Sequence, residues 1–266
     1  QKNMQSLKET GVLFVEPTCG LLACGDIGRG KLADQEDIME MIHYALSKKT
    51  LTGKKILVSA GPTQESIDPV RYITNHSSGK MGYAIAKAAF CLGADVTLVS
   101  GPTYLKKPYG INCINVVSAD DMYQAIHEIS KQQDFIIMSA AVGDYASQNI
   151  ADQKIKKNDH KMTLELIKNK DILFDLGQKK LPQQILCGFA METSDLIEHA
   201  QDKLKKKNCD MIVANHLKTD GAGFQGDTNI VTFITQDSMK DYGLLSKDEL
   251  AYEILMTLKK MEESLC

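Results

Sequence analysis

The sequence lacks a long hydrophobic run, an excess of charge of one sign and any closely paired cysteines. No apolar run approaches the roughly 18 residues of a membrane span, so we expect no membrane segment. The 31 basic and 34 acidic residues give a net charge of −3, which argues against a nucleic-acid protein that relies on broad basic charge. The start, Gln1 to Asn3, has no initiator Met and no signal-peptide core, so we expect a piece of a longer chain.

The cysteines predict neither a disulfide framework nor a zinc site. Their number is odd and no two are spaced Cys-x-x-Cys. Most lie in apolar stretches, such as 90–92 and 186–188, which favours buried free thiols. Free thiols suit a reducing compartment, so we expect a cytoplasmic protein. The seven stand at positions 19, 24, 91, 113, 187, 209 and 266.

The composition, 43% hydrophobic and 24% charged, is typical of a globular protein and not of a disordered one. A length of 266 residues fits one large domain or two small ones. A short strand at 12–16, a glycine-rich loop and a helix over 35–48 precede a predicted linker. We therefore expect two units, 1–50 and 51–266. The apolar stripe expected on the first helix is Ile38, Met41, Ile42, Ala45 and Leu46.

Strand-like and helix-like stretches alternate after the linker. This alternation predicts an α/β fold, a doubly wound and mostly parallel sheet in a Rossmann-like three-layer sandwich. A strand at 228–235 is expected to be antiparallel or near the edge, and an amphipathic helix over 246–263 closes the chain. The other strands are expected at 54–60, 95–100, 113–117, 134–140, 184–190 and 210–215. The other helices are expected at 80–92, 119–132, 171–179 and 194–208.

The connection after the first of these strands is unusually long. Such connections take about 2–6 residues, whereas residues 61–78 intervene here. The insertion follows the carboxyl end of a strand, where such sheets bind ligands. Ser77 to Lys80 would combine a capping hydroxyl, close N–H groups and a positive helix end, which predicts an anion site with Ser78 and Gly79 as contacts. A plain capped helix start is the alternative.

The glycine pattern here matches neither of two common nucleotide motifs. A Walker A loop needs Gly where Thr74 stands and Ser or Thr where Met81 stands, and the dinucleotide fingerprint needs a glycine before Gly79. Within the insertion, Arg71 could pair with a carboxylate or a phosphate. Asn75 could hydrogen-bond an acyl carbonyl or a developing oxyanion.

A second group of candidates follows the fourth of these strands. Ala140 and Ala141 are small enough to let a base or a ribose approach the backbone. Asp144 is placed for a ribose, an amine or a metal, with a loop-capping role as the alternative. Lys154 and Lys156 would point the same way on a strand and could neutralise a polyphosphate, unless they form an ordinary solvated charge run.

Three more candidates come from later segments. Residues 168–173 lead into a helix whose first turn could contact a nucleotide. Phe189 ends a buried strand and is either a core residue or a base-stacking one. Lys203 and Lys207 lie four apart, so they share a helix face that is either exposed or lines the cleft.

These segments form an ordered series of motifs. G-P-T-x-E-x-I-D-P-V-R-Y-I-T-N-H-S-S-G-K-M-G stands at 61–82 and S-A-A-V-G-D-Y at 139–145. K-I-K-K at 154–157, K-N-K-D-I-L at 168–173 and G-F-A-M-E-T at 188–193 follow. In this order they closely resemble the phosphopantothenoylcysteine synthetase family, and the resemblance spans about 54–262.

A second resemblance covers residues 1–46. G-x-L-A-C-G-D-x-G-x-G at 20–30 is similar to the C-terminal substrate clamp of phosphopantothenoylcysteine decarboxylase, which bacteria often fuse ahead of the synthetase. The resemblance implies that Cys24 donates a proton only in a full-length chain. The body that binds FMN and holds the catalytic His is not in this sequence, so we do not expect decarboxylation by this piece alone.

The resemblance implies a CTP-using and Mg²⁺-using ligase of coenzyme A biosynthesis. The carboxylate of 4′-phosphopantothenate would attack the α-phosphate of CTP, releasing pyrophosphate and forming an acyl-cytidylate. The amine of L-cysteine would then displace CMP and form the amide. The resemblance also implies a homodimer through the ligase domain, and larger assemblies when this domain is fused to the decarboxylase.

The resemblance assigns roles to single residues. Asn75 would hold the acyl group for the second step, Arg71 would support the phosphopantothenate side, and Lys154 would lie in a flexible flap. Lys170 departs from the family, which commonly has Pro there. The residues implied to contact CTP are Asp144, Lys154, Lys170, Asp171, Ile172, Leu173, Phe189, Lys203 and Lys207.

Two other functions stay open. An NAD(P)-dependent Rossmann-like oxidoreductase would need a glycine-rich first turn and an acidic residue ending the second strand. The sequence has G-P-T at 61–63 and Ser100-Gly101-Pro102 at those places, which argues against it. A non-catalytic nucleotide-binding scaffold would bind CTP without releasing pyrophosphate. No single residue decides between CTP and ATP, which eukaryotic relatives prefer.

Overall fold

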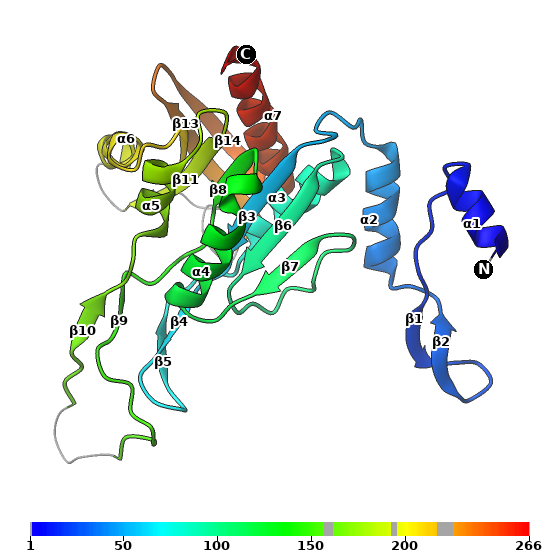
Figure 1. Cartoon of the computed structure of the whole chain (residues 1–266), viewed down its shortest axis with the longest axis horizontal. Helices are drawn as coiled ribbons and strands as arrows, with labels where there is room; N and C mark the ends of the chain where they lie inside the picture. The colour runs from blue at the N-terminus through cyan, green and yellow to red at the C-terminus, as the bar shows by residue number, and fades with distance from the viewer. Residues whose placement is uncertain (1, 157–161, 193–195, 217–225, 266) are drawn as a thin grey trace.

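The computed structural model describes residues 2–156, 162–192, 196–216 and 226–265, and its centre is one twisted sheet (Figure 1). The strands of this sheet are β3 (Lys55–Ala60), β6 (Asp95–Ser100), β7 (Asn112–Asn115), β8 (Phe135–Met138), β11 (Ile185–Glu192), β12 (Met211–His216), β13 (Thr228–Thr235) and β14 (Met239–Ser246). Their order is β14-β13-β12-β11-β8-β3-β6-β7. All neighbours from β7 to β12 are parallel, and β13 is antiparallel to both β12 and β14.

Helices cover both faces of the sheet. They are α3 (Lys80–Cys91), α4 (Ala119–Ile129), α5 (Ile172–Lys179), α6 (Leu196–Lys206) and α7 (Lys247–Leu265). Side chains alternate between the faces of a strand, so Ile56 and Val58 of β3 pack with α3 and α7. Leu57 lies between them in sequence and packs in the other core, with α4, α5 and α6. The doubly wound, mostly parallel three-layer fold is therefore confirmed.

The chain reverses direction across the sheet at β3. From β3 it moves outward to β6 and β7, and it then crosses back to β8 on the other side of β3. The carboxyl ends of β3 and β8 therefore flank a topological switch point, the place where open α/β sheets bind ligands. The predicted insertion and the segment around Ala141 begin at these two strand ends.

The N-terminal region differs from the prediction. The strand expected at 12–16 does not form, and the hairpin β1 (Thr18–Leu21) and β2 (Ile27–Lys31) follows the short helix α1 (Lys2–Glu9). The helix α2 (Gln35–Leu46) forms, but its apolar stripe is not a core: Ile42 and Leu46 are 43% and 82% exposed. The periodicity predicted the amphipathic helix, but periodicity does not show what covers an apolar stripe.

The helix α2 lies against α3 through a mixed surface. Tyr44 stacks on Phe90 of α3 with ring centroids 4.7 Å apart. Lys106, in the loop after β6, bonds Asp34 and Asp37 at 2.8 Å each, and these partners raise its pKa. Part of the predicted N-terminal unit thus touches the larger unit, and the domain boundary near residue 50 stays a prediction.

Three features of the remaining strands were not predicted. The edge strand β14 is largely exposed, so it has no buried alternation to reveal it. The hairpin β4 (Gln64–Ser66) and β5 (Tyr72–Thr74) lies inside the long insertion, and β9 (Tyr145–Ser147) pairs with β10 (Leu166–Lys168). Figure 1 shows both small hairpins as arms that extend away from the main sheet.

The cysteines are free in the described residues, but only some are buried. Cys187 and Cys209 are buried, and burial raises the pKa of the Cys209 thiol to about 12. Cys91 and Cys113 are half-buried. Cys19 and Cys24 are exposed on the first hairpin, so the prediction of burial fails where the chain folds outside the core. No helix in the described ranges is both long enough and apolar enough to cross a membrane.

The contact between α3 and β3 predicts a stability effect at Gly82. A β-carbon there would stand 2.6 Å from the Ala60 β-carbon and 2.9 Å from the Ser59 carbonyl oxygen. Because backbone would have to move, Gly82→Ala should lower the free energy of unfolding by about 1–3 kcal/mol in denaturant titration. Gly243→Ala has open space around it and serves as the control, with an expected change within about 0.5 kcal/mol. Equal stability of both variants would contradict this packing.

Candidate functional site

The long insertion joins the two strand ends at the switch point. The Ala141 N–H donates to the Gly61 carbonyl at 2.9 Å, and the Thr63 N–H donates to the Ala141 carbonyl at 3.3 Å. The Thr63 hydroxyl accepts the Gly143 N–H at 2.9 Å. These bonds bring the motif at 61–82 and the motif at 139–145 into one surface, as sequence reasoning expected of a ligand site.

Asn75 lies directly on this surface. Its Nδ2 donates to the carbonyls of Ala141 at 3.0 Å and Val142 at 3.3 Å, and its side chain is exposed to solvent. The amide is therefore oriented by the backbone of the neighbouring motif while remaining accessible to a substrate. A side chain held in this way can present a hydrogen-bonding group at a fixed position, which an acyl-transfer site requires.

The start of α3 is built around glycine, and the Ser77 hydroxyl bonds the N–H of the N-cap residue itself. Gly79 occupies the N-cap at φ 79° without a side-chain cap, and the Ser77 hydroxyl accepts the Gly79 N–H at 3.3 Å. A β-carbon on Gly79 would meet Thr103 at 2.8 Å and the Gly61 α-carbon at 3.3 Å. The positive end of α3 opens beside Ser78, at the same edge as Asn75.

Asp144 and the segment at 168–171 are tied together. The Asn169 N–H donates to the Asp144 carbonyl at 2.8 Å, and Asn169 Nδ2 donates to the Gly143 carbonyl at 2.9 Å. The Asp144 side chain is exposed, and Ala140 is anchored by its N–H to the Ser59 hydroxyl at 3.1 Å. The structure thus brings together Ala140, Ala141, Asp144 and the fourth motif.

Asp171 and the two predicted lysines meet at the start of α5. Asp171 caps α5 by accepting the Phe174 N–H at 2.9 Å, and its other oxygen contacts the Lys207 ammonium. Burial works to raise the pKa of Asp171, but the Lys207 hydrogen bond and other contacts lower it overall. Lys203 donates to the Phe189 carbonyl at 2.7 Å. These residues form one group, with Ile172 buried beside them and Leu173 half-buried.

Two members of the predicted nucleotide set have structural contacts that the sequence did not reveal. Phe189 is half-buried and packs against the α3 and α7 core, so it does contribute to the hydrophobic core. Lys170 turns to α4, where it bonds Asp120 at 2.9 Å and lies 4.6 Å from the Tyr123 ring centroid. The bond to Asp120 raises the pKa of Lys170.

Arg71 is paired inside the protein. Its Nε and Nη2 donate to Asp68 Oδ2 at 2.9 and 2.5 Å, and Nη2 also donates to the Ile155 carbonyl at 3.1 Å. The bidentate carboxylate partner foreseen for this arginine is therefore a side chain of the same chain. Lys154, next to Ile155, is exposed; Lys157 of the same motif and Thr193 of the fifth lie outside the described residues.

Cys24 is not part of this group. It is exposed in the turn between β1 and β2, where its thiol lies 3.8 Å from Asp26 Oδ2. Figure 1 shows that hairpin standing apart from the main sheet. The structure therefore separates Cys24 from Asn75, Lys203 and Lys207. Within the described ranges, no group of three or more His, Cys, Asp or Glu side chains could hold a metal ion.

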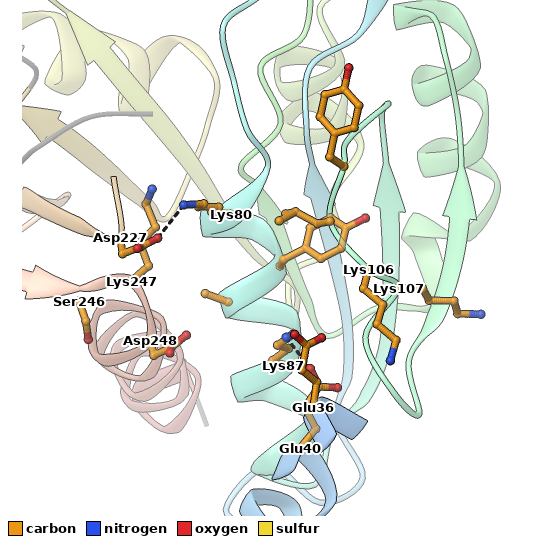
Figure 2. Close-up of a pocket in the computed structure, with 14 residues that line it drawn as sticks. Glu36, Glu40, Lys80, Lys87, Lys106, Lys107, Asp227, Ser246, Lys247 and Asp248 are labelled. Carbon is orange, nitrogen blue, oxygen red and sulfur yellow. Dashed lines mark hydrogen bonds and ion pairs between the residues drawn. The ribbon is translucent and has the colours of Figure 1, made fainter. Parts of the chain in front are cut away.

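A cavity of about 560 Å³ lies on the other side of α3 and does not contain the predicted site residues apart from the helix start. Figure 2 shows Lys80 directed at Asp227, at 2.7 Å. Lys87 likewise contacts Glu40. The lining carries both cations and anions, and two of its lysines are paired with lining carboxylates, which does not favour binding of a polyanion.

Sequence reasoning missed two buried amides at the carboxyl edge of the sheet. Asn215 is the second-last residue of β12 and Asn229 the second residue of β13, with exposed fractions of 5% and 3%. Both Oδ1 atoms are buried, and neither has a hydrogen-bond partner among the described residues. Asn215 pairs with Val231, two residues from Asn229, so both side chains face the α3 side. A polar residue near the end of an apolar strand was the sequence signal that could have identified these two asparagines.

Comparison with known proteins shows the family to which the chain belongs. Residues 51–261 match the family described as the DNA/pantothenate metabolism flavoprotein C-terminal domain. The chain is 45% identical to the coenzyme A biosynthesis bifunctional protein CoaBC of Bacillus subtilis (strain 168), covering 99% of this chain and 66% of that one. The chain thus spans about two thirds of the length of the curated relatives it matches.

Two further similarities bear on the fold and on function. A crystal structure of the C-terminal domain of CoaBC superimposes with a TM-score of 0.71 at 43% identity, covering 82% of this chain and 100% of that chain. A cysteine/cysteine sulfinic acid decarboxylase of an unknown prokaryotic organism is 43% identical over 96% of this chain and 73% of its own. The homologues thus include proteins of coenzyme A biosynthesis. From the match over 51–261, the chain belongs to the family of the DNA/pantothenate metabolism flavoprotein C-terminal domain.

Proposed function

We propose that this chain is a phosphopantothenate–cysteine ligase of coenzyme A biosynthesis. Its substrates are 4′-phosphopantothenate, L-cysteine and CTP. The phosphopantothenate carboxylate attacks the α-phosphate of CTP, so that pyrophosphate leaves and an acyl-cytidylate forms. The L-cysteine amine then attacks the acyl carbon, CMP leaves, and an amide remains. Activation is needed because a carboxylate oxygen is a poor leaving group and CMP is a good one.

The observation that carries the proposal is the position of Asn75. Its amide is anchored on the Ala141 and Val142 carbonyls at the switch point, beside the uncapped start of α3. One edge thus offers a positive helix end for a phosphate and, beside it, an exposed amide. This amide would serve an acyl oxygen by moving an Nδ2 hydrogen from a backbone carbonyl to the substrate. An acyl phosphate has both groups adjacent to each other.

The charged residues fit a triphosphate. Lys203 of α6 binds the Phe189 carbonyl in β11, and Lys207, directly after α6, binds Asp171 at the start of α5. Lys154 is exposed on the segment next to Arg71. Cations here would spread the charge that develops on the leaving pyrophosphate. Mg²⁺ usually takes one or two carboxylates together with substrate phosphates, and the exposed Asp144 suits that role. FMN would belong to a decarboxylase portion that this sequence does not include.

The experiment is pyrophosphate release from the purified chain with Mg²⁺, 4′-phosphopantothenate and L-cysteine, with CTP and ATP in parallel. We expect release with CTP that depends on phosphopantothenate. Release with ATP alone would keep the ligase and change the nucleotide. CTP binding without release, in a folded sample, would favour the non-catalytic scaffold.

A homodimer through the ligase domain is part of the proposal. Several large apolar side chains on the two arms are exposed, where a second copy would cover them. They are Val70, Tyr72, Tyr145, Ile150, Leu166 and Ile167. Sedimentation equilibrium should give twice the mass of 29.4 kDa. A monomeric mass at micromolar concentration would contradict it.

A further inference from the structure

We propose that Asp68 is a positioning residue that fastens the segment 151–155, and with it Lys154, to the turn between β4 and β5. Its effect on catalysis rests on the proposed function, whereas its effect on the segment does not. The fastening uses side-chain and backbone bonds between parts of the chain more than 80 residues apart.

Asp68 is the centre of this contact. Its carboxyl group is 3% exposed, and Oδ1 accepts the N–H groups of Val70 at 2.9 Å and Arg71 at 2.8 Å. Oδ2 accepts the Arg71 guanidinium and also the Ile155 N–H at 3.1 Å. One carboxylate therefore holds its own turn with one oxygen and the distant segment with the other.

The same turn binds the segment through two more hydrogen bonds. Arg71 Nη2 donates to the Ile155 carbonyl at 3.1 Å, so both backbone groups of Ile155 are bound. The Ala151 N–H donates to the Ile67 carbonyl at 3.0 Å. The segment is thus tied at both ends, and Lys154 lies between the two attachments with its side chain exposed.

The charge on Asp68 makes this attachment strong. Hydrogen bonds to an ionised group are shorter and roughly twice as strong as neutral ones. The Arg71 guanidinium holds the pKa of Asp68 well below its usual range, so the carboxylate stays ionised throughout the physiological pH range. Arg71 donates to both Asp68 and Ile155. Arg71 therefore also helps to hold the segment that carries Lys154.

The test is Asp68→Asn with hydrogen–deuterium exchange of the peptide 148–156. An asparagine can keep the two turn bonds through Oδ1, but its amide group faces the guanidinium and the Ile155 N–H as a donor. We expect exchange in this peptide to become at least about tenfold faster, because the segment opens more often. Asp152→Asn removes the same charge from an exposed position in the segment and should leave exchange unchanged.

Activity gives the second readout. In Asp68→Asn, Lys154 should lose its fixed position, and kcat for pyrophosphate release should fall by roughly tenfold because a misplaced charge at a reacting group is costly. KM for L-cysteine should stay unchanged. Arg71→Lys gives a second variant if Asp68→Asn does not fold. A lysine ammonium keeps the charge but lacks the planar fork of donors with which Arg71 binds Asp68 and the Ile155 carbonyl. Exchange of the peptide 148–156 in Arg71→Lys should therefore rise by a smaller factor.

The outcomes separate the two proposals. Unchanged exchange of 148–156 in a folded Asp68→Asn protein would overturn the fastening, whatever happens to activity. Faster exchange in a chain whose wild type releases no pyrophosphate would keep the fastening and reject the ligase. Faster exchange with wild-type kcat would show that Asp68 holds the segment without positioning Lys154 for the reaction.

Discussion

Replacing Lys154 by Gln is expected to lower pyrophosphate release by about 10²-fold or more while leaving the fold intact. The side chain is exposed and supports no packing, so its removal costs little stability. Its segment is fastened beside the insertion that carries Asn75. In the proposed ligase, a cation held there would stabilise the negative charge that grows as CTP is attacked, and loss of one such group typically costs about this much in rate.

Lys156→Gln is the matched control for this variant. Lys156 is also exposed and two residues away, but it lies beyond the Ile155 attachment. Circular dichroism and thermal unfolding should be the same for both variants and for the wild type. Turnover at the wild-type rate in a folded Lys154→Gln protein would refute the role of Lys154. Equal losses in both variants would indicate a general effect of charge instead of a specific contact.

Replacing Asn75 by Asp is expected to let the first step proceed but to stall amide formation by about 10²-fold. A carboxylate cannot donate to the Ala141 and Val142 carbonyls that now accept from Nδ2, so the side chain loses its anchor. Its negative charge would also repel the oxyanion that develops when the amine attacks the acyl carbon. The acyl-cytidylate should therefore accumulate.

Rapid chemical quench followed by chromatography separates the two steps. In Asn75→Asp, the acyl-cytidylate should build up with a burst of pyrophosphate, and the amide should appear slowly. Asn169→Asp makes the same chemical change against the neighbouring Gly143 carbonyl, and we expect it to slow both steps together. A normal yield of amide from Asn75→Asp would exclude the assigned role.

The sequence was informative about the sheet for a physical reason. Strands buried on both faces must be apolar throughout, and Lys55–Ala60 and Phe135–Met138 stand out as such runs between amphipathic helices. The edge strand β14 and the two small hairpins have mostly exposed residues, so their sequences carry no burial signal. The strand expected at 12–16 was wrong because a short apolar run does not show that a partner strand exists.

The candidate site residues also divide into those that the sequence indicated and contacts that only the structure shows. Local pattern and family resemblance together marked Asn75, Asp144 and Lys154, because the insertion at 61–78 interrupts an otherwise regular alternation. Neither could show that the Arg71 guanidinium is satisfied by Asp68 and Ile155, or that Lys170 turns to Asp120. Nor could they show that the side-chain oxygens of Asn215 and Asn229 are buried with no hydrogen-bond partner in the described part of the chain.

The sequence by itself determined the layered α/β fold and the edge of the sheet where ligands would bind, because both follow from hydrophobic periodicity and chain order. The tertiary structure alone decided which side chains are partners there. A hydrogen bond such as that from Ile155 to Asp68 joins residues 87 apart in the chain. Only packing of the intervening helices and strands brings such donors and acceptors within 3 Å or so of each other.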